Sequence, residues 1–400
     1  MILELTISIF LGITAGTITG LIPGVHTNLV SVILISSSLF LLNYFTPIGL
    51  VIFIIAMSIA NSFVDFIPSI YLGAPDEETV LGVMPGHKFL LSGKGHEAIV
   101  LTLIGSGLGI FLFIIFIPVF SLVLPVIYPF LQKIMGFILI WISILLILGE
   151  KTSKLRTIII FILAGFLGIS VFNLNINQPL LPLLSGLFGS STLIYSISKQ
   201  TQIPEQKTNI PKIEKRQLIK PVIATSIISP ICSFLPGLSS SEAAIIGSKI
   251  TGKLNKKQFL ILLGSINTLI MSLSFITLYL INKSRTGSAS AISQIIELSK
   301  SEMILIILTI ILSAIISVII TIKISKLVSN KINKINYTKI SKIILILIAL
   351  IILVISGLTG MLVFIISTVL GLTCISFNVR RGFLMGSLLV PTILYYLPFF

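Results

Sequence analysis

The sequence predicts an all-α polytopic membrane protein made of two inverted-topology repeats. Hydrophobic residues make up 55% of its 400 residues and charged residues only 10%, whereas soluble proteins carry roughly 25% charged residues. Ten apolar stretches are long enough to cross a bilayer, five on each side of a polar linker at 199–220. Two further apolar stretches are interrupted by Pro-Gly near their middles. This composition excludes a water-soluble or disordered protein.

The ten expected spans follow the chain in two sets. They lie at 46–70, 98–124, 134–149, 157–172 and 180–198, and then at 258–282, 303–322, 343–357, 360–377 and 383–399. The linker is too short to be a soluble domain. We therefore expect a first transmembrane repeat at 1–198, a cytoplasmic linker at 199–220 and a second, inverted repeat at 221–400.

The two interrupted stretches, 4–42 and 221–249, predict re-entrant helical hairpins. Only about a dozen residues separate Gly237 from Lys249, too few to reach the far side of a bilayer. Pro-Gly ends a helix, and Ser or Thr just after it can cap a new one. Each repeat is thus expected to contain one re-entrant hairpin and five transmembrane helices, with broken backbone buried in protein or lining a cavity.

The distribution of basic residues predicts which segments face the cytoplasm. The net charge is +15, which in a membrane protein indicates cytoplasmic loops rather than nucleic-acid binding. With both hairpins re-entrant, 23 of the 27 Lys and Arg residues fall in cytoplasmic segments. These segments are 71–97, 150–156, 199–220, 249–257, 323–342 and 378–381. This arrangement places the N-terminus outside the cell. The expected location of the protein is the cell membrane of a prokaryote.

The order of elements predicts the inverted repeat and, from it, a class of function. Five full crossings per half is an odd number, so the second half must be inverted relative to the first. Residues pair weakly between the halves, Pro23-Gly24 with Pro236-Gly237 and Asn61 with Asn267. Inverted repeats with helices broken near the midplane are typical of secondary transporters.

The two Pro-Gly breaks predict a site for an anion. A helix that starts after each break leaves backbone N–H groups without intrahelical partners, and the helix dipole adds a positive potential there. Two such tips that meet from opposite faces could hold one anion, or the breaks could simply kink two helices. The candidate substrate-binding residues are Pro23, Gly24, Val25, His26, Thr27, Asn28, Pro236, Gly237, Leu238, Ser239, Ser240 and Ser241.

Two acids at membrane depth are candidates for binding a coupling ion, H⁺ or Na⁺. Asp65 lies four residues after Asn61, on the same helical face, and Glu242 lies in the first turn after the second break. Ionisable groups at such depth are costly and usually functional. Asn61 and Asn267 complete this candidate set. The alternatives are an interhelical hydrogen bond for Asp65 and an N-terminal capping role for Glu242.

The polar loop 71–97 and its counterpart 283–300 are candidates for a gate or substrate funnel, through Asp76, Glu77, Lys283 and Arg285. The acids and histidines of 71–97 would support a membrane enzyme only if they converged on a metal. Their spacing fits no metal signature, and a solvated loop is the plainer alternative. We expect no bound metal and no cofactor.

Several motifs resemble those of a known family. They are Gly20-Leu21-Ile22-Pro23-Gly24-Val25-His26-Thr27-Asn28, the run from Tyr71 to Thr79, Met84-Pro85-Gly86-His87, the run from Leu235 to Glu242 and the run from Arg380 to Gly386. They resemble archaeal members of the TctA family, the large membrane subunit of tripartite tricarboxylate transporters. The resemblance implies uptake of citrate-like acids driven by a cation gradient. It also implies two partners, a small membrane subunit and an extracytoplasmic binding protein.

The paired hairpins also resemble those of polyprenyl-phosphate translocases, which move the phosphate head of a lipid carrier across the membrane. The expected function is therefore a secondary transporter, or permease, that moves an organic anion by alternating access with cation coupling. The alternative is a translocase for an anionic lipid carrier. An organic anion or anionic lipid and the surrounding membrane lipids are the expected partners, with no nucleic acid. A homo-oligomer is left open.

Overall fold

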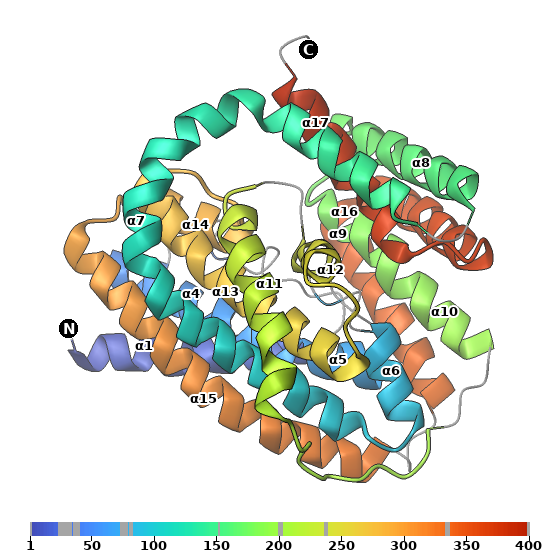
Figure 1. The fold of residues 1–400 in the computed structure, drawn as a ribbon, viewed down its shortest axis with the longest axis horizontal. Helices are drawn as coiled ribbons and strands as arrows, with labels where there is room; N and C mark the ends of the chain where they lie inside the picture. The colour runs from blue at the N-terminus through green and yellow to red at the C-terminus, as the bar shows by residue number, and fades with distance from the viewer. Residues whose placement is uncertain are drawn as a thin grey trace.

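The computed structural model describes residues 2–22, 34, 41–72, 79, 83–150, 153–198, 203–235, 239–332 and 337–397, and this part of the chain contains helices and no strand (Figure 1). The helices of the first half are α1 (Ile2–Leu21), α4 (Pro47–Val64), α5 (Phe66–Tyr71), α6 (Val83–Leu91), α7 (Gly95–Leu148), α8 (Lys154–Asn173), α9 (Leu180–Leu184), the π-helix η2 (Ser185–Ser190) and α10 (Ser191–Ser198). Those of the second half are α11 (Lys215–Cys232), α12 (Ser240–Ile250), α13 (Lys256–Ile281), α14 (Gly287–Ile295), α15 (Lys300–Ile332), α16 (Tyr337–Ser376), the 3-10 helix η3 (Arg381–Met385) and α17 (Gly386–Tyr396).

The prediction of an all-α polytopic membrane protein is confirmed. Within the described ranges, seven helices are long and apolar enough to cross a membrane. Capping residues explain where several helices begin. Thr46 caps α4 by accepting from the Gly49 N–H at 3.2 Å, with Pro47 in the first turn. Asn255 and Gln258 form a reciprocal capping box at α13, which satisfies two of the N–H groups that a helix start leaves unpaired.

The expected break between 98–124 and 134–149 is a bend rather than a loop. The structure has one helix there, α7, which is 54 residues long and contains Pro118, Pro125 and Pro129. Each proline removes a helical hydrogen bond and bends the helix without having to end it. A straight helix of this length would measure about 80 Å, but Figure 1 shows α7 arching over one end of the molecule. The two expected spans are therefore the two limbs of one bent helix.

The expected spans 343–357 and 360–377 are likewise joined, in α16. Gly357 has φ 66° and ψ −164° within this helix, a backbone conformation that only glycine adopts readily. The helix axis changes direction at this residue with no loop between its two parts. The span expected at 180–198 consists of α9, η2 and α10 in succession, and the span at 46–70 consists of α4 and α5.

The helices form two bundles, each with its own hydrophobic core. The larger core joins α4, α5, α7 and α11 to α15, and α1 packs against α4 beside it. The smaller bundle consists of α8, α9, η2, α10, α16, η3 and α17 around two adjoining cores, and the last turn of α7 reaches it through Leu146. We call these the first and second bundles. Ile245 and Ile246 on α12 pack against the core of the second bundle, so α12 lies between the two.

The innermost helices are α4 and α13, one from each half of the chain. Their apolar windows are 94% buried, against 22% for α7 and α16. Glycines let their neighbours approach closely. A Cβ at Gly105 of α7 would meet the backbone oxygen of Ile261, and a Cβ at Gly12 of α1 would lie 2.5 Å from the backbone oxygen of Phe53. The packing is reciprocal between the halves, since α7 lies on α13 and α15 lies on α4.

Candidate functional site

Helices α11 and α12 pack against each other as a hairpin, with one face of α11 exposed and the start of α12 buried (Figure 1). The Lys220 ammonium, near the start of α11, donates to the carbonyl of Lys253 at 3.2 Å, just after the end of α12. A Cβ at Gly247 would lie 3.1 Å from the Ala224 Cβ, so α12 packs along α11. The 11 residues of α12 rise only about 16 Å, which is too short to cross a bilayer.

A capping box fixes the start of α12. Ser239 has an extended backbone, and its Oγ accepts from the Glu242 N–H at 3.3 Å. In return, Glu242 Oε2 accepts from the Ser239 N–H at 3.2 Å. Ser240 and Ser241, in the first turn, are fully buried, and Glu242 is 1% exposed. The capping alternative for Glu242 is thus observed, and its role with a coupling ion stays a prediction. Pro236, Gly237 and Leu238 lie outside the described residues.

The first interrupted stretch also returns to its starting point. Glu4 Oε1, in the first turn of α1, accepts from both the N–H and the hydroxyl of Thr46 at 2.7 Å. Gly12 and Gly20 place α1 directly against α4, with the end of α1 beside Asn61. Thr46, before α4, thus lies beside Glu4 in the first turn of α1, while the end of α1 lies beside Asn61. The candidate residues Pro23, Gly24, Val25, His26, Thr27 and Asn28 lie outside the described residues.

Asn61 and Asp65 lie where α4 meets the end of α1, and each is 5% exposed. Asn61 Nδ2 donates to Thr19 Oγ1 of α1 at 3.1 Å. Asp65 marks the junction of α4 and α5. Three residues later Pro68 has no N–H to offer the Val64 carbonyl, which interrupts the helical hydrogen bonding beside the carboxylate. A polar break therefore lies inside an otherwise apolar helix.

Asn267 brings the second half to the same level of the core. Its Nδ2 donates to the Ser62 carbonyl of α4 at 3.3 Å, directly after Asn61 in the chain. Two residues earlier, Ser265 shares a hydrogen bond of 2.6 Å with Thr225 of α11. All four of these side chains are buried. Asn267 therefore bonds the α4 backbone one residue after Asn61, whereas the Asn61 side chain bonds α1.

The described candidate gate residues lie away from the buried polar residues around Asn61 and Asn267. Lys283 is exposed beyond the end of α13, and the 16 positions between it and Asn267 correspond to about 24 Å of helix. Arg285 is partly buried before α14. Asp76 and Glu77 lie outside the described residues, so the acidic half of the proposed funnel has no geometry to report. Among the residues that the structure does describe, no group of three His, Cys, Asp or Glu side chains could hold a metal.

A buried polar cluster joins residues that the sequence analysis did not connect. His96 Nδ1 lies 2.8 Å from Ser325 Oγ, and the Tyr71 hydroxyl lies 2.5 Å from Ser329 Oγ. These contacts join the start of α7 and the end of α5 to α15. The signal was present in the sequence, because hydroxyl residues recur every fourth position along one face of α15. They are Ser313, Ser317, Thr321, Ser325 and Ser329, all buried.

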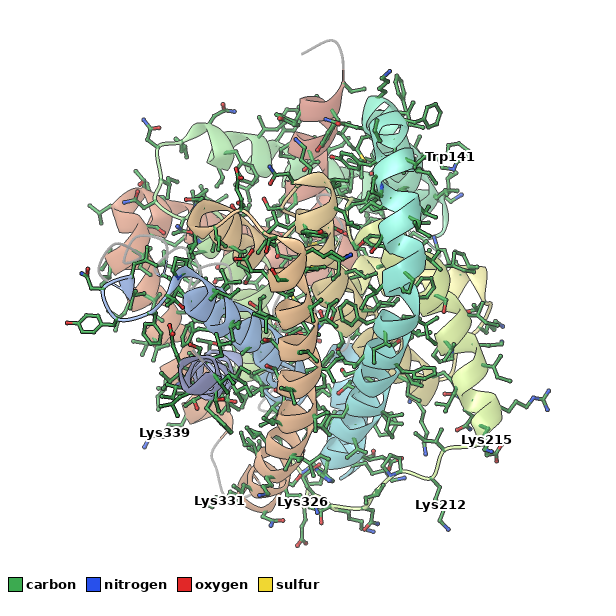
Figure 2. The ribbon with its side chains drawn as sticks, turned by 90° about the vertical axis from the view of Figure 1, so that its left-hand side faces the viewer. Trp141, Lys212, Lys215, Lys326, Lys331 and Lys339 are labelled. Carbon is green, nitrogen blue, oxygen red and sulfur yellow. The ribbon has the colours of Figure 1, made fainter. Side chains whose placement is uncertain are left out.

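Lysines of two basic segments, 199–220 and 323–342, lie at one end of the molecule. Figure 2 shows Lys212, Lys215, Lys326 and Lys331 at the end opposite Trp141. Contacts also join other segments expected in the cytoplasm to their neighbours. Glu97 pairs with Lys257 at 2.9 Å, Glu150 with Arg380 at 3.2 Å, and Lys249 donates to the Leu145 carbonyl at 3.1 Å. Gln206 of the linker donates to the Leu90 carbonyl at 2.9 Å.

Comparisons with known proteins place this geometry in context. A family model described as the tripartite tricarboxylate transporter TctA family matches residues 6–386. An uncharacterized protein of Methanocaldococcus jannaschii is 34% identical over 291 residues, which cover 71% of this chain and 71% of that relative. No solved structure matches the chain. The region that the family model matches includes both hairpins and all the described candidate residues.

Proposed function

Because this chain belongs to the tripartite tricarboxylate transporter TctA family, a family of transporter components and not of enzymes, we propose that it is a permease that moves an organic anion, a carboxylate, by alternating access. The observation that carries the proposal is the buried start of α12. There an 11-residue helix begins between the two bundles with three polar residues, Ser240, Ser241 and Glu242.

The physics of that helix start suits an anion. Backbone N–H groups of the first turn point out of the helix end, and the dipole adds about half a positive charge there. Ser240 and Ser241 contribute hydroxyls at the same place. The tip 23–28 of the first hairpin supplies the opposing half of the site in this proposal. Both hairpins are re-entrant, which is supported by the contacts Glu4–Thr46 and Lys220–Lys253 between their open ends.

Alternating access needs two halves that exchange roles, and the packing supports an inverted repeat. In the first half, Thr19 bonds Asn61, 42 positions later. In the second half, Gln258 bonds Gln217, 41 positions earlier. Helix α1 thus packs against α4 at nearly the same separation in sequence as α11 packs against α13. The two halves then rock about the contact between α4 and α13.

Cation coupling follows from the buried acids. Asp65 and Glu242 bind the H⁺ or Na⁺ in this proposal, with Asn61 and Asn267 beside them. The basic end in Figure 2 faces the cytoplasm, since the positive-inside rule applies to short loops, and the membrane is the cell membrane of a prokaryote. A small membrane subunit and an extracytoplasmic binding protein are the partners that the family membership supports.

A translocase for a polyprenyl phosphate is the second candidate, because a phosphate would fit the same helix start. The test is to reconstitute the protein in liposomes and to measure binding of citrate and of a short-chain polyprenyl phosphate. Binding of citrate together with gradient-driven accumulation supports the permease. Binding of the lipid phosphate alone supports the translocase, and binding of neither refutes both.

Substitutions at Ser240 show whether the ligand lies at the start of α12. Ser240→Asp places a negative charge at the helix N-terminus, where the dipole favours it, so the fold should tolerate it while anion binding is lost. Ser240→Ala should weaken binding by about one to two decades, the contribution of one hydrogen bond to a charged group. Ser248→Asp, two turns later on α12, is the matched control and should bind as the parent protein does. Parental binding by Ser240→Asp would rule out an anion at this tip.

A further inference from the structure

Two adjacent arginines before η3 have different electrostatic surroundings. Arg380 Nε pairs with Glu150 at 3.2 Å, and that carboxylate is only 1% exposed. Arg381 pairs with no acid among the residues that the structure describes. Its Nη1 donates to the hydroxyl of Thr192 and, at 3.4 Å, to the carbonyl of Phe188. One arginine thus has its own carboxylate, whereas its neighbour has only neutral oxygens.

The side chain of Arg381 is partly buried. Burial lowers the pKa of Arg381 to about 10, so the group is still charged at neutral pH. The charged form of a group removed from water is costly unless an opposite charge faces it. The neutral acceptors use only Nη1, and the side chain is not fully shut off from solvent. Arg381 therefore has donors left for a ligand.

Arg381 lies beside the helix whose start holds the proposed anion site. A Cβ at Gly382 would lie 3.6 Å from Ile245 Cδ1 of α12. Ile245 is one helical turn after Ser241 and shares its face, so the two positions are about 6 Å apart along the helix. Figure 1 shows α12 between α13 and the helices α9 and α16 of the second bundle. The backbone next to Arg381 thus lies against this face of α12, while the Arg381 guanidinium contacts Phe188 and Thr192 of the second bundle.

We propose that Arg381 binds the anionic group of the transported ligand, a carboxylate or a phosphate, beside the face of α12 that carries Ser241 and Ile245. A guanidinium matches the two oxygens of either group with a planar pair of donors. The proposal rests on the proposed function and names a second residue of the same site, contributed by the second bundle.

The test compares Arg381→Gln and Arg381→Lys with the parent protein, using citrate and a short-chain polyprenyl phosphate as separate probes. Arg381→Gln should weaken binding of the transported probe about tenfold to a hundredfold, as expected for a hydrogen bond to a charged group. Arg381→Lys should recover part of this loss, because it restores the charge without the planar pair of donors. A purely structural role predicts instead a lower melting temperature without ligand and an unchanged affinity.

A labelling experiment on the parent protein does not depend on how the variants fold. Phenylglyoxal modifies arginines, and peptide mass spectrometry reads each one separately. Saturating probe should protect Arg381, whereas the exposed Arg156 and Arg216 should react equally with and without it. The probe that protects distinguishes a carboxylate from a lipid phosphate. Binding without protection, or an unchanged affinity in Arg381→Gln, overturns the role of Arg381 and leaves the permease intact. Failure of the parent protein to bind either probe overturns both.

Discussion

Two substitutions at the start of α12 separate the capping role of Glu242 from a role in ion coupling. In the capping box, Glu242 Oε2 accepts from the Ser239 N–H at 3.2 Å and Ser239 Oγ accepts from the Glu242 N–H at 3.3 Å. A glutamine side chain can accept the same bond, so Glu242→Gln keeps the box and removes the charge. Ser239→Ala keeps the charge and removes one of the two bonds.

The expected magnitudes follow from that geometry. Ser239→Ala should lower the free energy of unfolding by about 1 kcal/mol, the usual contribution of a cap, and should keep gradient-driven accumulation. Glu242→Gln should cost at most about 1 kcal/mol, from the lost interaction with the helix dipole. It should nevertheless abolish accumulation while leaving exchange or binding partly intact.

Proteoliposomes with an imposed H⁺ or Na⁺ gradient measure accumulation of citrate, and counterflow without a gradient measures exchange. Denaturation in detergent measures the free energy of unfolding of each variant. Full accumulation by Glu242→Gln would show that this carboxylate only caps the helix. Loss of accumulation by Ser239→Ala to the same degree would show that the geometry of the tip, and not the charge, limits transport.

Three further predictions test packing, topology and pH dependence. Gly105→Ala should destabilise the protein by about 1–3 kcal/mol, because its Cβ would collide with the backbone of α13, whereas a Cβ at Gly107 meets nothing within 4 Å; equal melting temperatures for Gly105→Ala and Gly107→Ala would contradict the close contact. Cysteines placed at Ser284 and at Pro211 should react with impermeant reagents from opposite sides of the membrane, since Cys232 and Cys374 are both buried; labelling of both from outside would refute the inverted topology. Burial lowers the pKa of His87, so the folded protein binds this proton less readily than the unfolded chain does, and stability should fall as the pH drops below about 6.5. His87→Gln should flatten that dependence, and an unchanged profile in melting experiments would exclude the histidine as its source.

The helices could be located from the sequence because their signals are local. Apolar stretches of the right length predicted the spans, and Ser239 with Glu242 three residues later is a cap that can be recognised without a structure. The joins within α7 and α16 could not be predicted in the same way. Pro125 and Gly357 each occur in sequences that end helices and in sequences that only bend them, and the packing around them decides which outcome is realised.

The sequence likewise predicted only some of the contacts in the candidate site. Asn61 and Asn267 were paired from their positions in the two halves, and their shared role stays a prediction; the structure shows Asn267 bonded to the carbonyl of Ser62, the residue after Asn61. The partners of His96 and Arg381 could not be identified, since Ser325 is 229 positions from the first and Thr192 is 189 positions from the second. No local pattern specifies contacts over such separations.

The sequence by itself determined that this chain is an all-α membrane protein, which stretches are helical and which segments carry the positive charge. These properties depend on hydrophobicity, capping and charge, which act within a few residues. Only the tertiary structure decided that α7 is one bent helix, that α12 lies between two bundles and that Arg380 has a carboxylate while Arg381 has none. Such features depend on close packing between distant helices, for which glycines such as Gly105 remove the side chain that would keep the backbones apart.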